Sequence, residues 1–248
     1  MRVAIWPIAA LLVLSPVSFA QSASGPIPLQ TSSGTGFTGA PYSGRETTVT
    51  EKTLSDHTTT TQTFVQLLWR DASGRTRREM IRHTETGEEY RSVIITDPVA
   101  GVYLKWQAGD MSALKVASIW PLASAQKVTA TAGSEPASLM NPGSGVSRPG
   151  YLREVLTPQT INGEYAQGTR TTRTIRLDEE NSDRVIEVTN ELWISPELRI
   201  IMRHVTIDPR TGKSTTEMSD VVRGDPDPGL FQAPDGYQVV DHREKNSQ

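Results

Sequence analysis

The chain contains no cysteine among its 248 residues, has no excess of basic side chains and carries its one long apolar run at the start. Without cysteine there are no disulfides, thiolate zinc sites, iron–sulfur clusters, cysteine nucleophiles or lipidated cysteine anchors. Its 25 Lys plus Arg residues are outnumbered by 28 Asp plus Glu residues. Nucleic acid and anionic membranes attract basic surfaces, so the composition excludes them as partners.

The first 20 residues predict an export signal. Arg2 supplies the positive charge, residues 5–17 are almost wholly apolar, and Ser18 and Ala20 provide the small residues of a cleavage site after Ala20. The alternative is a membrane anchor, but this run is interrupted by two prolines and is shorter than the about 20 residues that span a bilayer. We therefore expect an exported protein, periplasmic or extracellular, whose mature chain has no transmembrane segment.

The remaining sequence predicts one domain with flexible appendages. Residues 21–44 are small and uncharged, which favours a flexible leader, and residues 242–248 form a polar tail. Between them, residues 45–241 predict a single β domain. More than half of residues 109–150 are Gly, Ala, Ser or Pro, so this insertion is expected to be partly disordered or to fold over the sheet as a lid.

The pattern of the domain is that of strands. Threonine and β-branched residues are abundant, and Gly or Pro interrupts them every ten to fifteen residues. Turn residues predict hairpins at 71–74, 97–101 and 208–212, and residues 230–240 predict a closing plug and a last strand. Helical spacing occurs weakly at 113–120. We predict a mainly β fold of about nine strands, arranged as a curved antiparallel sheet or a half-open barrel.

Residues capable of catalysis or metal binding are present without a catalytic or metal-binding pattern. His83 lies near Glu85, Glu88 and Glu89, but this segment is typical of a solvated hairpin tip. The sequence has no nucleophile elbow, no Ser-x-x-Lys pair and no phosphate-binding glycine loop. It therefore predicts no catalytic residue, no metal and no cofactor, and the protein is not expected to be an enzyme.

Clustered arginines raise the question of an anion site. Alternation along a strand sends Arg75 and Arg77 to one face and Arg78 and Arg82 to the other, which disperses their charge. Pairing with the plentiful glutamates is the expected role of these side chains.

Five large apolar residues are candidates to line a ligand site on the sheet. The alternative for the tryptophans on strands is that they fill the core, because most large aromatic side chains do. The candidate lining residues are Trp69, Leu104, Trp106, Trp120 and Leu192.

Several stretches carry a resemblance to known proteins. Segments 68–79, 160–172, 191–198 and 226–237 resemble a family of exported proteins of soil bacteria to which no activity is assigned. The Phe-x-x-Pro-x-Gly-Tyr motif at residues 231–237 and the large number of strands are more distantly similar to periplasmic lipoprotein carriers and to the envelope-stress sensors related to them. That second resemblance implies a curved half-barrel that holds acyl chains against a concave sheet.

Two functions of different classes follow from these patterns. The first is a non-catalytic exported module that shelters an apolar ligand or an acyl chain on the concave side of its sheet. The second is a structural or protein-interaction module of the cell envelope that has no small-molecule ligand. An apolar ligand or another envelope protein is accordingly the expected partner.

Overall fold

The computed structural model describes residues 38–54, 56–84, 86–109, 115–122, 150–179 and 182–243. The predicted signal peptide, most of the leader, most of the insertion, the last residues of the tail and Glu85 lie outside the described residues. Within the described ranges, no helix has the length and apolar character needed to cross a membrane.

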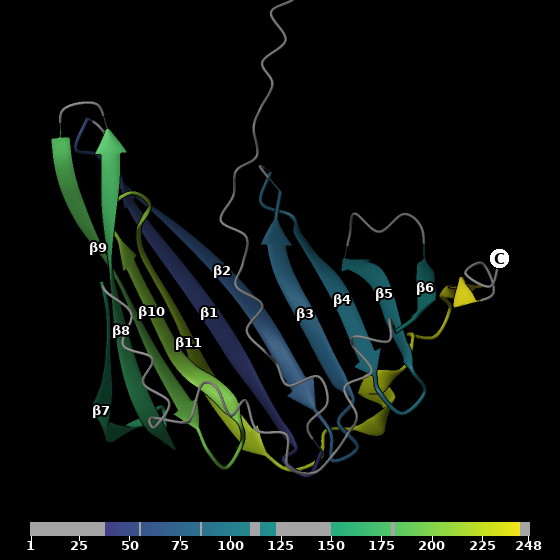
Figure 1. Cartoon of the computed structure of the whole chain (residues 1–248). Helices are drawn as coiled ribbons and strands as arrows, with labels where there is room; N and C mark the ends of the chain where they lie inside the picture. The colour runs from purple at the N-terminus through teal and green to yellow at the C-terminus, as the bar shows by residue number, and fades with distance from the viewer. Residues whose placement is uncertain are drawn as a thin grey trace, which may run out of the picture. The chain divides into compact units, whose positions relative to one another are not determined.

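The described residues form one sheet of twelve strands and a single turn of 3-10 helix, η1 (Figure 1). The strands are β1 (Tyr42–Thr53), β2 (Thr59–Arg70), β3 (Thr76–His83), β4 (Glu89–Asp97), β5 (Val102–Gly109), β6 (Val116–Pro121), β7 (Tyr151–Ile161), β8 (Glu164–Glu179), β9 (Ser182–Ser195), β10 (Ile200–Asp208), β11 (Gly212–Arg223) and β12 (Gln238–Asp241), with η1 at Pro228–Phe231.

The sheet is curved and open. Its order is β12-β6-β5-β4-β3-β2-β1-β11-β10-β9-β8-β7, so β12 and β7 form two separate edges (Figure 1). Two meanders, β1 to β6 and β7 to β11, meet where β1 pairs antiparallel with β11. This arrangement confirms the predicted mainly β fold and its curved, half-open sheet. One pairing departs from the antiparallel pattern, because β12 runs parallel to β6.

The predicted hairpins are confirmed, but the predicted strand number was too low. The turns at 71–74, 97–101 and 208–212 join β2 to β3, β4 to β5 and β10 to β11. The additional strands are β6, β7 and β8, whose apolar alternation is weak. The helical interpretation of 113–120 was wrong, because β6 occupies 116–121 and pairs with β5 and β12.

Apolar side chains gather in two clusters on this sheet. The first cluster joins strands from the middle of the sheet to the β7 side and contains Tyr42, Leu68, Ile161, Ala166, Trp193, Leu198, Ile200, Met202 and Met218. The second lies on β4 to β6 beneath η1 and contains Val93, Ile95, Trp106, Ala117 and Phe231.

A buried arginine adjoins the first cluster. The side chain of Arg70 is 1% exposed. Its Nε and Nη2 donate to the carbonyl oxygen of Ala40 at 3.0 and 2.7 Å, and Nη2 also donates to the carbonyl oxygen of Leu198. Its guanidinium carbon lies 4.9 Å from the centroid of the Tyr42 ring. Arg70 thus ties the end of β2 to the segment before β1 and to the turn between β9 and β10.

Burial also affects the phenol that Arg70 faces. Desolvation raises the pKa of Tyr42 to about 12, although the positive charge of Arg70 acts in the opposite direction. The phenol therefore stays protonated in the folded protein well above the pH at which an exposed tyrosine ionises.

Candidate functional site

The candidate site lies where the C-terminal part of the chain crosses the sheet. Register places Trp69, Ile95 and Leu104 in one row on one face, and Val93, Trp106 and Ala117 in the neighbouring row on that face. We call these six residues the aromatic strip. Alternate residues of the strands point to this face, and on β3 the two rows are occupied by Arg77 and Glu79.

Residues 228–237 cover this strip, and we call them the cover segment. Its Phe231 is 5% exposed and belongs to the same apolar cluster as Val93 and Trp106. Leu230, Ala233 and Tyr237 pack against that cluster as well. The predicted plug at 230–231 and the predicted last strand, observed as β12, are therefore both present.

Local sequence explains how the cover segment is formed. Asp227 caps η1 by accepting a hydrogen bond from the Gly229 backbone N–H at 2.8 Å, and Pro228 starts the helical turn. Just before the segment, Asp225 accepts a hydrogen bond from the Ala72 backbone N–H in the β2–β3 turn at 2.7 Å. The chain is thereby capped at the start of η1 and tied to the β2–β3 turn just before it.

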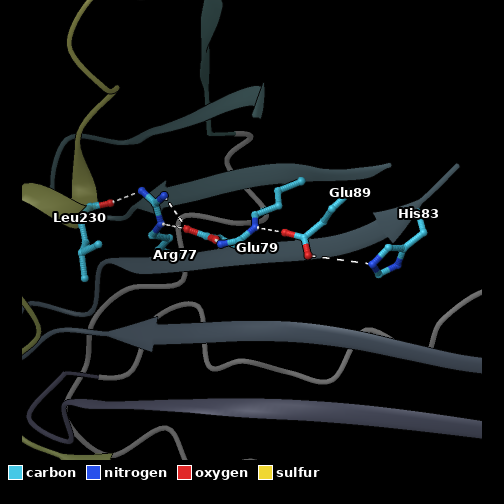
Figure 2. A network of polar contacts seen from close by, with 6 residues as sticks. Arg77, Glu79, His83, Glu89 and Leu230 are labelled. Carbon is cyan, nitrogen blue, oxygen red and sulfur yellow. Dashed lines mark hydrogen bonds and ion pairs between the residues drawn. The ribbon is translucent and has the colours of Figure 1, made fainter. Parts of the chain in front are cut away.

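Arg77 is the main polar link between the strip and the cover segment (Figure 2). Its Nη1 donates to the carbonyl oxygen of Leu230 at 2.6 Å. Its guanidinium carbon lies 5.8 Å from the ring centroid of Trp69 and 5.2 Å from that of Trp106. The cation therefore contacts the aromatic strip and the cover segment at the same time.

A chain of alternating charges runs from Arg77 to the β3–β4 hairpin tip (Figure 2). Nε and Nη2 of Arg77 donate to Glu79 Oε1 at 2.8 and 2.6 Å, and Arg91 Nη1 donates to Glu79 Oε2 at 3.2 Å. Arg91 also forms an ion pair with Glu89. Oε2 of Glu89 lies 3.9 Å from Nε2 of His83. The Glu79 side chain is 9% exposed, so its two arginine partners offset the cost of burying a carboxylate.

One polar atom in the strip has no partner among the described residues. Trp106 is 2% exposed, and its indole Nε1 has no hydrogen-bond acceptor there. An unpaired buried donor costs about 1–3 kcal/mol. The strip is thus apolar but retains one N–H group that an acceptor oxygen would satisfy.

The structure brings together three of the five predicted lining residues. Trp69, Leu104 and Trp106 belong to the aromatic strip or pack against its cluster. Trp120 is on the other face of β6, where its ring stacks on Tyr103 and on His242 at centroid distances of 6.5 and 3.9 Å. Leu192 is on β9, paired with His204 on β10, at the opposite side of the sheet order.

Sequence reasoning missed the role of Arg77. It placed Arg77 on a strand face and expected it to pair with glutamate, which the Glu79 contact confirms. The contact with Leu230 was not foreseen, because it joins residues 153 positions apart. The available signal was the hairpin register, which puts Arg77 opposite Trp69 and makes a cation beside an aromatic ring predictable.

The predicted hairpin tip at His83 is also present. His83 and Glu89 are exposed, with relative side-chain areas of 60% and 44%. Among the described residues, no three His, Asp or Glu side chains come together as a possible metal site.

The opposite face of the sheet carries a network of hydroxyl and amide groups. Thr48 and Thr216 hydroxyls lie 2.8 Å apart across β1 and β11, and Thr206 donates to Asn190 Oδ1 at 2.9 Å across β10 and β9. Such cross-strand pairs stabilise a sheet by about 0.2–1 kcal/mol each. His204 lies between these pairs, and burial lowers its pKa below 6.5.

This histidine predicts a pH dependence of folding. The folded protein binds a proton at His204 less readily than the unfolded chain does, so the free energy of unfolding should fall as the pH drops below about 6.5. His204→Gln should flatten this dependence in urea titrations between pH 5 and pH 8, a range of about three units around the histidine pKa. His83→Gln, at the exposed tip, is the matched control and should leave it in place.

The comparisons with known proteins give likenesses to solved structures alone. No protein-family model matches the chain, and none of the curated proteins matches it. The chain is similar to MucB in a complex with MucA(peri), with 11% identity and a TM-score of 0.36, over 81% of this chain and 57% of that one. It is similar to MucB in the Pseudomonas aeruginosa MucA/MucB complex, with 13% identity and a TM-score of 0.37, over 80% of this chain and 58% of that one.

A third likeness is to a protein of the LolA superfamily from Nitrosomonas europaea. The identity is 10% and the TM-score 0.27, over 77% of this chain and 90% of that one. The chain spans less than two thirds of the MucB chains that it matches. The resemblance of segments 68–79, 160–172, 191–198 and 226–237 to a family of exported proteins stays a prediction.

Proposed function

We propose that this protein is an exported, non-catalytic binding protein that holds an apolar chain, such as an acyl chain, between the aromatic strip and the cover segment. The observation that carries the proposal is the strip itself, where Trp69, Leu104 and Trp106 are covered by a short C-terminal segment that is not part of the meander. When an apolar chain enters there, its contacts with the strip replace those that Phe231 and Leu230 make with the strip. Both sets of contacts are apolar.

Displacing the cover segment should cost less free energy than opening the sheet. Removing a strand from the sheet would break a ladder of backbone hydrogen bonds, whereas moving residues 228–237 breaks few polar contacts. The principal ones are Arg77 to Leu230, and the Tyr237 hydroxyl donating to the Gln107 carbonyl oxygen at 3.1 Å. Each such bond contributes about 0.5–3 kcal/mol, with the charged donor at the upper end.

The preferred ligand also follows from the polar group of the site. Trp106 Nε1 lacks an acceptor in the described part of the chain. It is a donor within an apolar setting. A ligand with an apolar chain and one oxygen-bearing end satisfies it, as a fatty acid or an acyl ester does.

Loosening the cover segment is expected to increase binding. In the double variant Arg77→Met/Glu79→Gln, the link to Leu230 is lost and no buried carboxylate is left without its arginine. Because opening becomes easier by about one charged hydrogen bond, the affinity for the fluorescent fatty acid cis-parinaric acid should rise about tenfold. The measurement is a fluorescence titration of the mature protein.

Arg82→Met is the control, because Arg82 lies on the same strand and projects to the other face, over Phe64. It should leave the affinity unchanged. Trp69→Ala should weaken binding through lost contact area. Equal affinities in the wild type, the double variant and Trp69→Ala would contradict the proposed site.

A further inference from the structure

We infer that Asn162, in the turn between β7 and β8, is a site of spontaneous deamidation, and that its conversion to aspartate or isoaspartate releases this turn from β11. The inference is independent of ligand binding at the aromatic strip. Two observations carry it: Asn162 is the one asparagine of the sequence that is followed by glycine, and its side-chain amide bonds to β11.

Asn162 and Gly163 form an exposed two-residue hairpin turn. Ile161 pairs with Glu164, so these two residues alone join β7 to β8. Both have positive φ values, +48° and +86°, as the central residues of a type I′ turn do. Both are exposed, and no atom of the described residues lies within 4 Å of a Cβ atom built on Gly163. Water therefore reaches the Asn162 amide, and neither a side chain nor a neighbour crowds that side of the turn.

The reaction needs only the protein and water. The backbone nitrogen of Gly163 attacks the side-chain carbonyl carbon of Asn162 and forms a carbon–nitrogen bond. The side-chain nitrogen leaves as ammonia, taking up the proton that the attacking nitrogen loses. Water then opens the resulting cyclic imide at either carbonyl group, which gives aspartate or isoaspartate without any electron transfer. Glycine favours the attack because it has no side chain to obstruct it and the widest choice of backbone angles.

The Asn162 amide holds the turn against β11. Its Nδ2 donates to Glu217 Oε1 at 2.9 Å and to the carbonyl oxygen of Met218 at 2.8 Å. Burial acts to raise the pKa of Glu217, but hydrogen bonds from Arg203 and Asn162 outweigh it, so the net shift is downward. Glu217 is therefore a carboxylate at neutral pH, and Nδ2 supplies a donor to this charge and to a backbone oxygen.

Deamidation replaces this donor by an acceptor. The new carboxylate would face the Glu217 carboxylate and the Met218 carbonyl oxygen, where like charges in contact repel. The release is local, because Glu164 Oε1 still accepts a hydrogen bond from Arg223 Nε at 3.0 Å. It nevertheless reaches the first apolar cluster, since Ile161 and Met218 both belong to that cluster.

Mass spectrometry of the mature protein during incubation at mildly alkaline pH tests the reaction. We expect the peptide that contains Asn162 to gain the mass that replacement of an amide by an acid adds. Asn190 is the internal control, because it is followed by Glu191 and lies within β9, and its peptide should not change. Gly163→Ala, where the structure leaves room for the methyl group, should slow the gain about tenfold or more.

Two results would overturn the proposed reaction. One is no mass gain at Asn162 under conditions that deamidate a synthetic peptide of residues 158–167. The other is an equal gain at Asn162 and Asn190.

Hydrogen–deuterium exchange of Asn162→Asp tests the release of the turn. This variant carries the charged product from the start and keeps a residue that tolerates a positive φ. Exchange in peptides that span 160–164 should be about tenfold faster than in the wild type, as expected for loss of a hydrogen bond to a charged group. In Asn162→Asp/Glu217→Gln the glutamine amide can donate to the new carboxylate, so most of this difference should disappear. Equal exchange in Asn162→Asp and the wild type, or no rescue in the double variant, would contradict the release.

Discussion

Replacing Arg70 by alanine is expected to lower the free energy of unfolding by about 4 kcal/mol, the largest effect predicted for a single side chain here. Two causes add. The side chain is 1% exposed, so its removal leaves a cavity, and the carbonyl oxygens of Ala40 and Leu198 lose a charged donor. Chemical denaturation of the purified variant measures the change.

A second variant at this position separates the two causes. Arg70→Met fills much of the same space but donates no hydrogen bond, and it also removes the cost of burying a charge. We expect it to lose about 2 kcal/mol, between the wild type and Arg70→Ala. A methionine variant as stable as the wild type would show that the bonds to Ala40 and Leu198 contribute no net stability.

Substitution of Gly212 by alanine is expected to cost about 3 kcal/mol. Gly212 begins β11 with a φ of +99°, and a Cβ atom there would lie 2.1 Å from the carbonyl oxygen of Glu51. That oxygen belongs to the backbone of β1, so relief of the clash requires two paired strands to separate. The expected result is a lower urea midpoint with an unchanged slope.

Gly87→Ala is the matched control for this prediction. Gly87 has a φ of +86°, but no atom lies within 4 Å of a Cβ built there. Alanine at this position should lower the free energy of unfolding by about 1 kcal/mol, through the strain of the positive φ alone. Equal losses for the two variants would mean that the approach of Gly212 to β1 has no energetic consequence.

The sequence predicted best those parts of the fold whose signals are local. The Asp and Gly residues of the turns at 71–74 and 208–212 determine their hairpins, and the alternation of Val102, Leu104 and Trp106 determines the buried face of β5. In each case the partner strand follows directly in the chain, so spacing alone identifies the pairing.

The strands that sequence reasoning missed lack this signal for physical reasons. Leu152 and Val155 are exposed on opposite faces of the edge strand β7, so no dry face imposes an apolar alternation. The short strand β6 packs between β5 and β12, and the parallel pairing with β12 joins segments that are distant in sequence. Long-range pairing of this kind leaves no local pattern to read.

The sequence allowed the kinds of residue in the candidate site to be predicted. It did not allow the contacts that bring them together to be predicted. Trp69 and Trp106 stand out as large aromatics on strands, and Phe231 stands out as a closing plug. Their meeting depends on the path of residues 224–237 across β3 to β5, which Arg77 fixes through the Leu230 carbonyl group. Trp120 and Leu192 share the residue type but point elsewhere, because strand position decides which face and which half of the sheet a side chain occupies.

Hydrogen–deuterium exchange of the mature protein, with and without cis-parinaric acid, tests most directly whether the C-terminal segment is a displaceable cover. If it is, the ligand should speed exchange in peptides that span 228–237 and slow it in peptides that span 93–106, which include Trp106 and Leu104. Slower exchange in both segments, or no change in either, would contradict a site that opens beneath the cover segment.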